Sequence, residues 1–412
     1  QKNILILGSG GREAALAWKI KQSPNLGKLF IAPGNAGTDA FGENIALDIR
    51  DFETVADFCE NNSIDYVIPG SEELLVAGIS DYLNAYSFSK TVVTVGPHQQ
   101  AAALEGSKDF AKDLMKKHHI PTAGYQTFTK DSYQKGVDYL KNHSLPIVLK
   151  ADGLAAGKGV VIATTHEEAL DTFEEMIQDA KFGDASSKVV IEAFLIGIES
   201  SAFIFTDGTS YIRLPDAKDY KRIGEGETGL NTGGMGAVSP VPFMAGAYEE
   251  KVVQKVIEPT IKALQEENIS YQGFIFFGLI NVDGEPYVIE YNCRLGDPET
   301  EVILPRLEGD IISMFDLIGQ PTAVWESLAM KISTQHAATV MSVSGGYPGA
   351  IEKGKLITIE KHIPQATIFY AGAKKEKDQI LTNGGRVLAV TSLADSMEVA
   401  LNTSYEQLAS IK

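Results

Sequence analysis

The sequence predicts an α/β protein whose first part is a doubly wound parallel sheet. Short apolar runs alternate there with segments of helical periodicity, and the dipeptide Gly96-Pro97 ends this part. Alternation of β and α at this spacing is typical of parallel strands covered by helices. The predicted strands are residues 3–7, 28–32, 66–68 and 91–95, and the predicted helices are residues 12–21 and 52–60.

The rest of the chain has a mixed pattern that predicts further α/β and α+β units. A loop of small residues, 151–159, joins two predicted strands, 147–149 and 160–163. Other predicted strands are residues 189–191, 201–205, 211–214, 274–281, 287–290, 338–342, 367–371 and 386–390. The predicted helices are residues 107–117, 166–179, 248–267 and a segment that starts at residue 395.

Length and composition indicate a globular protein of several domains. A chain of 412 residues exceeds one ordinary core, because domains have about 100–200 residues. Its hydrophobic fraction of 44% and charged fraction of 22% exclude global disorder and a small disulfide scaffold. We expect no membrane span, since no apolar run approaches about 20 residues. We also expect no secretion signal, since no basic stretch with a cleavage site opens the sequence.

The charge and the cysteine count limit the partners and the compartment. The formal net charge is −18, so we expect no nucleic-acid partner, because non-specific binding needs a basic surface. An anionic substrate would need local Lys, Arg, backbone amides or a metal ion. Cys59 and Cys293 are the only cysteines, which favours a reducing, cytoplasmic location. Cys59 stands at helical spacing from Phe52, which predicts a role in core packing.

The segment Gly8-Ser-Gly-Gly-Arg-Glu13 follows a predicted strand and opens a helix. Glycines there let backbone amides approach a phosphate at a helix N-terminus. Two features disagree with a dinucleotide fingerprint: Glu13 replaces the third glycine, and no acidic residue follows the next strand. A phosphate site for a smaller ligand and a simple tight turn both stay open.

The segment Leu149-Lys-Ala-Asp-Gly-Leu-Ala-Ala-Gly-Lys-Gly-Val160 resembles a phosphate-binding P-loop only superficially. The glycine spacing is too short, and Gly159 stands where a P-loop has Ser or Thr. A small-residue hairpin with Lys150 and Lys158 suits a flap that closes over a triphosphate and excludes water. The alternative is a solvated hairpin.

The segment Val288-Ile-Glu-Tyr-Asn-Cys-Arg-Leu-Gly-Asp-Pro-Glu-Thr-Glu301 predicts a metal and phosphate site. Strand alternation puts Glu290, Asn292 and Arg294 on one face. Mg²⁺ prefers hard oxygen ligands, few of them from protein, and an arginine stabilises charge on a transferring phosphoryl group. The alternative is a polar strand with a structural salt bridge.

Two further segments are candidate anion sites. Asn231-Thr-Gly-Gly-Met-Gly236 follows Asp219-Tyr-Lys-Arg222, and a glycine cluster of this kind offers amides to a small carboxylate or phosphate. Lys108 stands at a helix start after Ser107, a good N-cap residue. A cation there opposes the helix dipole, which an anionic partner would explain. The alternatives are a surface loop and a surface lysine.

Eight strings, in order along residues 2–408, carry a family resemblance: Gly10-Gly-Arg-Glu13 with Ala15-Leu-Ala-Trp18, Ala32-Pro-Gly-Asn-Ala-Gly37, Leu104-Glu-Gly-Ser-Lys108, Lys150-Ala-Asp-Gly-Leu-Ala-Ala-Gly-Lys-Gly159, Asn231-Thr-Gly-Gly-Met-Gly-Ala237, Glu290-Tyr-Asn-Cys-Arg-Leu-Gly-Asp-Pro-Glu-Thr300, Gly345-Gly-Tyr-Pro-Gly349 and Asn383-Gly-Gly-Arg-Val387. With them the chain resembles the phosphoribosylamine–glycine ligase family (glycinamide ribonucleotide synthetases), ATP-grasp enzymes of de novo purine synthesis. The resemblance implies that ATP, glycine and 5-phosphoribosylamine give ADP, phosphate and glycinamide ribonucleotide through glycyl phosphate.

The resemblance also implies a role for individual residues. It assigns Mg²⁺ or Mn²⁺ to Glu290 and Asn292, and it makes Arg294 and Asp297 the catalytic residues. It gives contacts with ATP to Lys108, Lys150, Gly157, Lys158, Gly159, Glu192, Phe194, Leu195 and Glu199. It places phosphoribosylamine at Gly8, Gly10, Gly11, Arg12, Glu13 and Glu72, and glycine at Gly233, Gly234, Met235 and Gly236.

The implied fold is an ATP-grasp fold with an N-terminal doubly wound domain and a small C-terminal α+β domain. The expected boundaries are residues 1–103, 104–322 and 323–412, with a mobile lid at about residues 122–193. The expected partners are small molecules, with no nucleic acid and no membrane, and the expected state is a monomer or weak dimer.

The sequence departs from the family pattern at two places. Ala14 stands where the family usually has His, and Gly70-Ser-Glu-Glu-Leu-Leu75 lacks two prolines of the usual string but keeps Glu72. Three other functions stay open at this point: an NAD-dependent oxidoreductase that uses residues 8–13, a different ATP-grasp ligase or carboxylase, and a nucleotide sensor without turnover.

Overall fold

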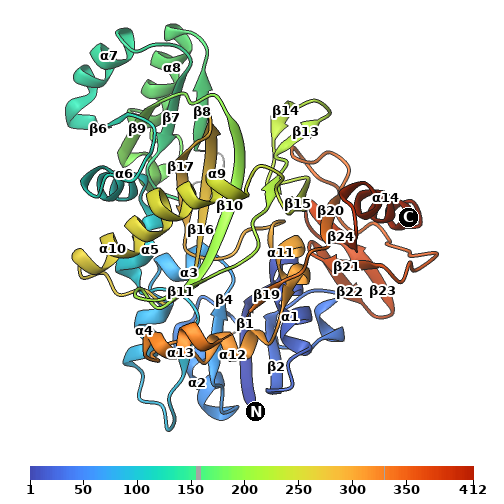
Figure 1. Cartoon of the computed structure of the whole chain (residues 1–412). Helices are drawn as coiled ribbons and strands as arrows, with labels where there is room; N and C mark the ends of the chain where they lie inside the picture. Colours follow the sequence, from blue (N-terminus) through green and yellow to red (C-terminus); the bar gives the residue numbers. More distant parts are fainter. Residues whose placement is uncertain (155–158, 329) are drawn as a thin grey trace.

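The structure is a computed structural model that describes residues 1–154, 159–328 and 330–412. Figure 1 shows a central sheet with three lobes around it: the N-terminal lobe below, an upper lobe that ends in α7 and α8, and a C-terminal lobe at the right. The candidate site residues lie where these lobes meet the central sheet.

The N-terminal lobe is the predicted doubly wound sheet. Its five strands are all parallel and follow the order β3 (Glu43–Asn44), β2 (Leu26–Pro33), β1 (Lys2–Gly8), β4 (Tyr66–Pro69) and β5 (Val93–Thr94). The continuous apolar run of β1 is buried on both faces, as parallel strands require. The helices of this lobe are α1 (Gly11–Lys21), α2 (Phe52–Asn61), α3 (Glu72–Val76) and α4 (Ile79–Ala85).

The upper lobe is a four-stranded antiparallel sheet with two helices and a core of its own. The strands follow the order β6 (Tyr125–Thr129), β9 (Lys188–Ala193), β7 (Ile147–Ala151) and β8 (Val160–Ala163), and the helices are α7 (Tyr133–Lys141) and α8 (His166–Ile177). Phe173 packs edge-on against Phe128 and stacks on Tyr133 in this core. The predicted pairing of residues 147–149 with 160–163 is confirmed by the antiparallel register of β7 and β8.

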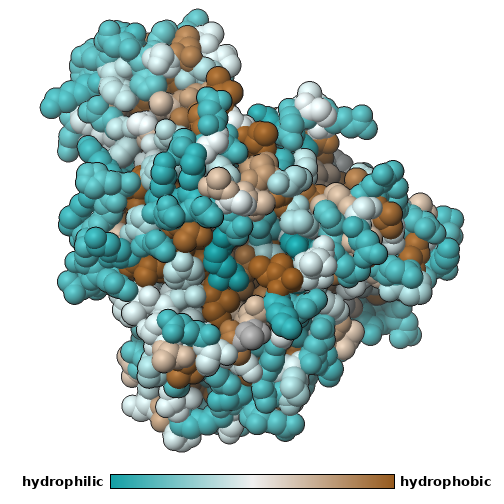
Figure 2. Space-filling model, in the orientation of Figure 1, coloured by the Kyte–Doolittle hydropathy of each residue, from teal (hydrophilic) through white to brown (hydrophobic). Residues whose placement is uncertain are grey.

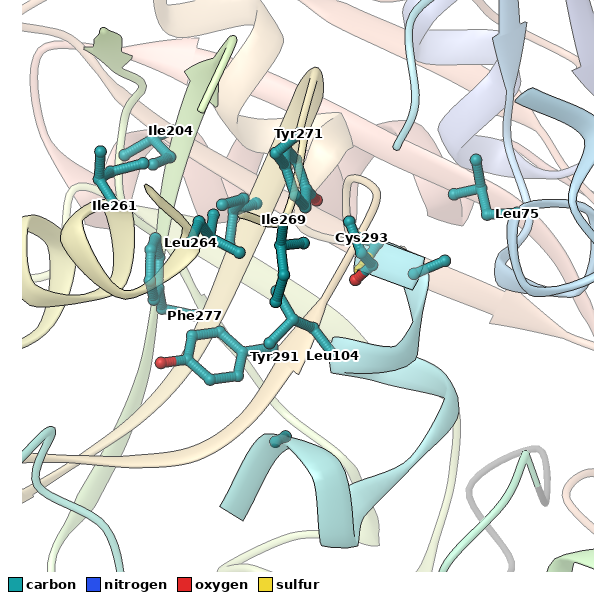
Figure 3. Packing of buried hydrophobic residues seen from close by; sticks show 14 of the residues in the cluster. Leu75, Leu104, Ile204, Ile261, Leu264, Ile269, Tyr271, Phe277, Tyr291 and Cys293 are labelled. Atoms are coloured by element: carbon teal, nitrogen blue, oxygen red, sulfur yellow. The ribbon is translucent and has the colours of Figure 1, made fainter. Parts of the chain in front are cut away.

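The central sheet shares one large core with the N-terminal lobe. Its antiparallel strands are β11 (Tyr211–Arg213), β10 (Ile198–Thr206), β16 (Gly273–Val282) and β17 (Glu285–Asn292). Figure 3 shows Tyr291 and Cys293 packed with Leu104, Ile269 and Tyr271 in this core. The helices associated with this part are α5 (Gln99–Gly106), α6 (Lys108–Lys117), α9 (Gly246–Val252) and α10 (Glu258–Glu266).

Two predictions about this part are confirmed. Cys59 is fully buried in the same core, and burial raises the pKa of its thiol to about 12, so its role is packing. The predicted helix of residues 248–267 forms as α9 and α10, but one π-helical turn, Val253–Ile257, separates them. Pro259 at the start of α10 lacks the N–H that a continuous α-helix would need.

The C-terminal lobe contains a sheet built from two distant parts of the chain. Its strands follow the order β12 (Lys218–Asp219), β15 (Gly236–Ser239), β20 (His336–Val343), β24 (Arg386–Ala394) and β21 (Ala366–Tyr370), and α14 (Met397–Ala409) packs on it. The sequence analysis did not predict β12 and β15. Among the described residues, no helix is long and apolar enough to cross a membrane.

Short elements connect these lobes. Two-stranded ribbons form from β13 (Arg222–Gly224) with β14 (Thr228–Asn231), from β18 (Leu307–Glu308) with β19 (Lys331–Ile332), and from β22 (Ala373–Glu376) with β23 (Gln379–Thr382). The remaining α-helices are α11 (Thr300–Arg306), α12 (Ile311–Phe315) and α13 (Thr322–Ser327).

Candidate active site

The end of β17 carries the predicted metal ligands. Tyr291 and Cys293 face the core, as the predicted alternation requires, and Glu290 faces outward and is exposed. Asn292 is 7% exposed, and its Nδ2 atom has no hydrogen-bond partner in the structure. A buried amide NH2 without an acceptor costs free energy, so this side chain suits a bound acceptor such as a phosphate oxygen, and its Oδ1 atom is the one that can bind a metal beside Glu290.

Glu290 lies in a field of positive charge. The surrounding protein partly desolvates the Glu290 carboxyl, which opposes ionisation, but Lys221, Lys150, Lys108 and Arg294 outweigh this effect and lower its pKa. Among the described residues, Glu290 forms no ion pair within 4.0 Å. An ionised carboxylate beside an amide oxygen is the hard-oxygen set that Mg²⁺ or Mn²⁺ takes, and few protein ligands leave room for phosphate and water. The residues present therefore fit such a metal.

Lys108 opens α6 at the predicted N-cap. Ser107 Oγ accepts the backbone N–H of Phe110 at 3.1 Å, which is the capping contact that the sequence predicts. The Lys108 ammonium donates to the carbonyl of Gly153 at 3.1 Å, at the start of the predicted flap. Burial lowers the pKa of Lys108, while Glu290 opposes this shift. An anionic ligand would favour the charged form.

The hinge between the upper lobe and the central sheet lies at the end of β9. Glu192 is buried and pairs with Lys150 at 3.0 Å, whereas Phe194 is 37% exposed and Leu195 is half-buried. Ile196 directly follows and is 80% exposed. Figure 2 shows apolar side chains gathered near the middle of this face, where the lobes meet, although most of the face is hydrophilic. Exposed apolar side chains beside free backbone suit a flat aromatic base.

The predicted ribose and flap residues complete the nucleotide side. Glu199 is exposed on β10, and Lys221 Nζ lies 3.5 Å from its Oε2 atom. The backbone N–H of Ala151 donates to the carbonyl of Gly159 at 2.8 Å and so closes the base of the hairpin. The predicted residues Gly157 and Lys158 lie outside the described residues.

Arg294 is held between two carboxylates. Its Nε atom lies 3.1 Å from Glu72 Oε2, and its Nη2 atom lies 2.8 Å from Glu105 Oε1. Glu105 also accepts the backbone N–H of Cys293 at 2.8 Å. Burial raises the pKa of Glu105 to about 7, against the opposing effect of Arg294. The two carboxylates therefore fix the position of the Arg294 guanidinium.

Glu13 fills the turn between β1 and α1. It accepts the backbone N–H of Gly10 at 2.6 Å, and a Cβ atom on Gly8 would collide with its carboxylate. Arg12 pairs with Glu13 at 2.7 Å, and its backbone N–H donates to Asp297. Protein carboxylates thus occupy two amides of this turn, which is unlike a dinucleotide site. Ala14, the departure from the family pattern, is fully buried, so a side chain there belongs to the core.

The C-terminal lobe reaches the site through Arg386. Its Nη2 atom lies 3.0 Å from Asp297 Oδ1, and its Nη1 atom donates to the carbonyls of Gly233 and Asp297 at 2.8 Å. Burial opposes the ionisation of Asp297, but Arg386 and Arg12 hold the pKa of its carboxyl below the usual range.

The predicted glycine segment is already bonded to protein. The N–H of Gly233 donates to the Tyr347 hydroxyl, the N–H of Gly234 to Thr232 and the N–H of Met235 to the carbonyl of Tyr220. Gly236 begins β15. The backbone N–H groups of residues 233–235 therefore have protein acceptors, and the segment borders the site without offering these N–H groups to a ligand.

Sequence analysis did not assign roles to several charged residues that the structure brings to the site. Lys221 lies among acidic groups that outweigh burial and raise its pKa, with Asp219 3.9 Å away. Burial and Asp219 raise the pKa of Glu299 to about 8. Lys221 and Arg386 both stand in strings that the sequence analysis named, Asp219-Tyr-Lys-Arg222 and Asn383-Gly-Gly-Arg-Val387. Their membership of these strings could have identified them as candidate site residues.

Comparison with family models assigns three consecutive parts of the chain. The N domain of phosphoribosylglycinamide synthetase matches residues 2–105, its ATP-grasp (A) domain matches residues 106–300, and its C domain matches residues 337–412. The three matches cover most of the chain in the order that the lobes follow.

Known relatives agree with this assignment. The chain is 42% identical to a phosphoribosylamine–glycine ligase of Pseudomonas syringae, over 99% of this chain and 94% of that protein. It is 44% identical to the Pasteurella multocida ligase, over 96% and 91% of the two chains. It is also 41% identical, over 98% of its length, to a bifunctional purine biosynthetic protein of Pichia angusta, of which it spans 51%.

Solved structures share the fold. The phosphoribosylamine–glycine ligase of Thermotoga maritima superposes with a TM-score of 0.84 at 33% identity, over 100% of this chain and 97% of that one. A biotin carboxylase domain of Hydrogenobacter thermophilus reaches a TM-score of 0.74 at 16% identity, over 100% and 90% of the chains, which shows the ATP-grasp fold alone. The chain belongs to the phosphoribosylamine–glycine ligase family, ATP-dependent ligases that attach glycine to phosphoribosylamine in purine biosynthesis.

Proposed function

We propose that the chain makes glycinamide ribonucleotide in two steps at one site. In the first step a carboxylate oxygen of glycine attacks the γ-phosphorus of ATP, and the bond to the departing ADP oxygen breaks. In the second step the amine of 5-phosphoribosylamine attacks the acyl carbon of glycyl phosphate, the C–O bond to phosphate breaks, and the nitrogen loses one proton. The activation step makes an otherwise uphill condensation possible.

The nucleotide side binds and orients ATP. Lys108 and Lys150 hold the phosphates, backbone groups of Glu192, Phe194 and Leu195 receive the adenine, and Glu199 holds the ribose. The support is the positive field of Lys221, Lys150 and Lys108 at Glu290, together with the ion pair between Lys150 and Glu192. Mg²⁺ or Mn²⁺ on Glu290 and Asn292 supplies charge neutralisation at the phosphates when bound. Gly157, Lys158 and Gly159 belong to the flap that covers the triphosphate.

The acceptor side binds glycine and the phosphoribosyl group. Arg294 stabilises the acyl phosphate, and Asp297 with residues 233–236 borders glycine. Gly8, Gly10, Gly11, Arg12, Glu13 and Glu72 border phosphoribosylamine. The support is two sets of ion pairs, Arg386 with Asp297 and Arg294 with Glu72. Arg12 connects them, because its N–H donates to Asp297 and its guanidinium shares the Leu295 carbonyl with Arg294. An acyl phosphate hydrolyses in water, so a rigid and enclosed acceptor side protects it.

The proposed function also implies a domain organisation and an oligomeric state. The proposed domains are residues 1–103, 104–322 and 323–412, and the lid at about residues 122–193 closes over the nucleotide. Its separate core supports motion as one body. We also propose a cytoplasmic monomer or weak dimer that acts on small molecules, without a nucleic-acid or membrane partner. The net charge of −18 supports the absence of a nucleic-acid partner.

The observation that carries the proposal is the placement of Glu290 and Arg294 on one strand end between the nucleotide cations and the acceptor ion pairs. The test is ADP release with phosphoribosylamine generated in the cuvette, with and without glycine. Release only with both substrates is the expected result. Release with bicarbonate in place of glycine would indicate another ATP-grasp reaction. ATP binding without any release would indicate a sensor.

A further inference from the structure

Three buried charged side chains meet where the upper lobe joins the rest of the molecule. Lys112 comes from α6, Glu192 from β9 and Lys150 from β7, and their side chains are 2%, 5% and 8% exposed. Lys112 Nζ lies 3.1 Å from Glu192 Oε2, and Lys150 Nζ lies 3.0 Å from Glu192 Oε1. One carboxylate thus stands between two ammonium groups, and the proposed function uses only one of these lysines.

Lys112 also holds the chain that leads into the upper lobe. Its ammonium donates to Thr122 Oγ1 at 2.7 Å, and the Thr122 hydroxyl donates to the carbonyl of Val288 at 2.7 Å. The N–H of Val288 in turn donates to the carbonyl of Pro121 at 2.8 Å. The contacts of Lys112 therefore extend from the lid strands to β17, two residues before Glu290.

The charge balance gives Lys112 a specific task. Ion pairs strengthen as the surroundings exclude water, so a buried glutamate with one lysine holds that lysine tightly. With Lys112 present, Glu192 has a second cation, and the Lys150–Glu192 contact lies outside hydrogen-bond geometry at Oε1. Lys150 Nζ donates to the carbonyl of Ile289 at 3.5 Å, and its remaining hydrogens are available for another acceptor. Burial lowers the pKa of Lys112 to about 8, and Glu192 opposes this shift, so the ammonium form persists at neutral pH.

We propose that Lys112 is a positioning residue that compensates the charge of Glu192, so that Glu192 does not compete with the nucleotide phosphates for Lys150. It also fixes the lid strands that carry Lys150 and Glu192 relative to α6, which begins with Lys108. This inference rests on the proposed contact between Lys150 and ATP. Lys112 itself touches no substrate.

The test compares Lys112→Met with the double variant Lys112→Met/Glu192→Gln in the full chain. The probe is a non-hydrolysable ATP analogue with Mg²⁺, and the readouts are its Kd by calorimetry and kcat with both substrates. Lys112→Met leaves Glu192 with Lys150 alone, so we expect about tenfold weaker binding, the effect of about 1.4 kcal/mol. Glu192→Gln in the same protein removes that competition, and we expect Kd to return to within about threefold of the unsubstituted protein.

Two controls separate this role from a purely structural one. Lys116→Met removes the same charge from an exposed position one turn further along α6, and we expect no change in Kd. Where Lys112→Met does not fold, Lys112→Gln serves, because its amide can still donate to Thr122 and the proposal requires the same roughly tenfold loss of affinity from it. Melting temperatures report on folding in each case.

Each remaining outcome decides between the proposals. A folded Lys112→Met variant with unchanged Kd overturns the inference, and so does a double variant that binds as weakly as the single one. Lys150→Ala tests the underlying assignment: unchanged affinity there removes the phosphate role of Lys150 itself. Weakened binding in Lys150→Ala with unchanged binding in Lys112→Met would remove only the role of Lys112.

Discussion

The two sides of the site use different cations in different ways. On the acceptor side Arg12, Arg294 and Arg386 each hold a carboxylate of the protein, at 2.7, 2.8 and 3.0 Å. On the nucleotide side the cations are lysines: Lys150 pairs with the buried Glu192 at 3.0 Å, whereas Lys108 Nζ donates only to the carbonyl of Gly153 among the described residues. Glu290 likewise has no ion pair there.

This difference matches what each side must do. Arginine is planar and keeps its charge, so its pairs fix a geometry before substrate arrives, which suits stabilisation of a developing charge. Lysine is a flexible point charge that can follow a moving phosphate. The acceptor side is therefore organised by the protein, whereas the nucleotide side is completed by ATP and metal. Variants that remove one charge from each side test this contrast.

Glu290→Gln should have the largest effect on activity. The substitution removes the carboxylate charge that the metal needs, and metal assistance to phosphoryl transfer amounts to several kcal/mol, so we expect turnover to fall about a thousandfold. The exposed side chain predicts an unchanged melting temperature. The measurement is ADP formation with both substrates over a Mg²⁺ titration.

A matched control is Glu285→Gln at the other end of the same strand, where the carboxylate binds Lys251 and Lys255 on the surface. We expect near-normal turnover from this control. Near-normal turnover in Glu290→Gln as well would remove Glu290 as a metal ligand, and the nucleotide side would lose its central group.

Arg386→Met should have the second largest effect and should act on the acceptor substrates. Truncating one partner of a partly buried charge pair typically costs at least 2 kcal/mol, so we expect kcat/KM for phosphoribosylamine to fall about 30-fold. Asp297 loses its strongest cation, while the nucleotide groups keep their contacts. Steady-state kinetics with each substrate varied in turn measure this split.

The ion pair of Arg213 with Glu249, at 2.8 Å, provides the control away from the site. Arg213→Met should leave kcat/KM for phosphoribosylamine within about twofold, since surface pairs contribute little. A weaker ATP affinity in Arg386→Met, with the acceptor kinetics unchanged, would contradict the division of the site into two sides.

The sequence predicts best what depends on local pattern. The parallel strands of the N-terminal lobe, the β7–β8 hairpin and the Ser107 cap follow from apolar runs, small residues and cap chemistry, and all appear as predicted. Short helices such as α3 and α12 were missed because five residues are too few for a helical period to show.

Contacts between segments that are distant in the chain could not be predicted from local sequence patterns. Strand β15 pairs with β20, about a hundred residues later in the chain, and nothing in the local sequence of residues 236–239 selects that partner. Arg386 meets Asp297 for the same reason, only after the C-terminal sheet has formed. Nothing in the local sequence marks Lys112 as a buried, paired residue, because Glu192 and Lys150 come from strands elsewhere in the chain.

Glu301→Gln should have a smaller effect, and on stability. Glu301 is fully buried under Gly11, and neither carboxyl oxygen has a hydrogen-bond partner in the structure. Burial, and then Asp297, raise the pKa of this carboxyl well above its usual value. A raised pKa means that the folded state keeps a proton which the unfolded state releases, so stability falls as pH rises above the ordinary Glu pKa of about 4.3.

The Gln side chain cannot ionise. The free energy of unfolding of the variant should therefore exceed that of the unsubstituted protein by a margin that grows as pH rises from 5 to 8, to about 1–2 kcal/mol. Denaturant unfolding at several pH values measures it, and Glu308→Gln, an exposed change of the same charge, should show no such trend. A higher free energy of unfolding of the Gln variant at high pH would mean that the buried Glu301 destabilises the protein beneath the arginine pairs of the acceptor side. A Gln variant as pH-dependent as the unsubstituted protein would mean that Glu301 ionises freely and that the acceptor side is looser than its ion pairs suggest.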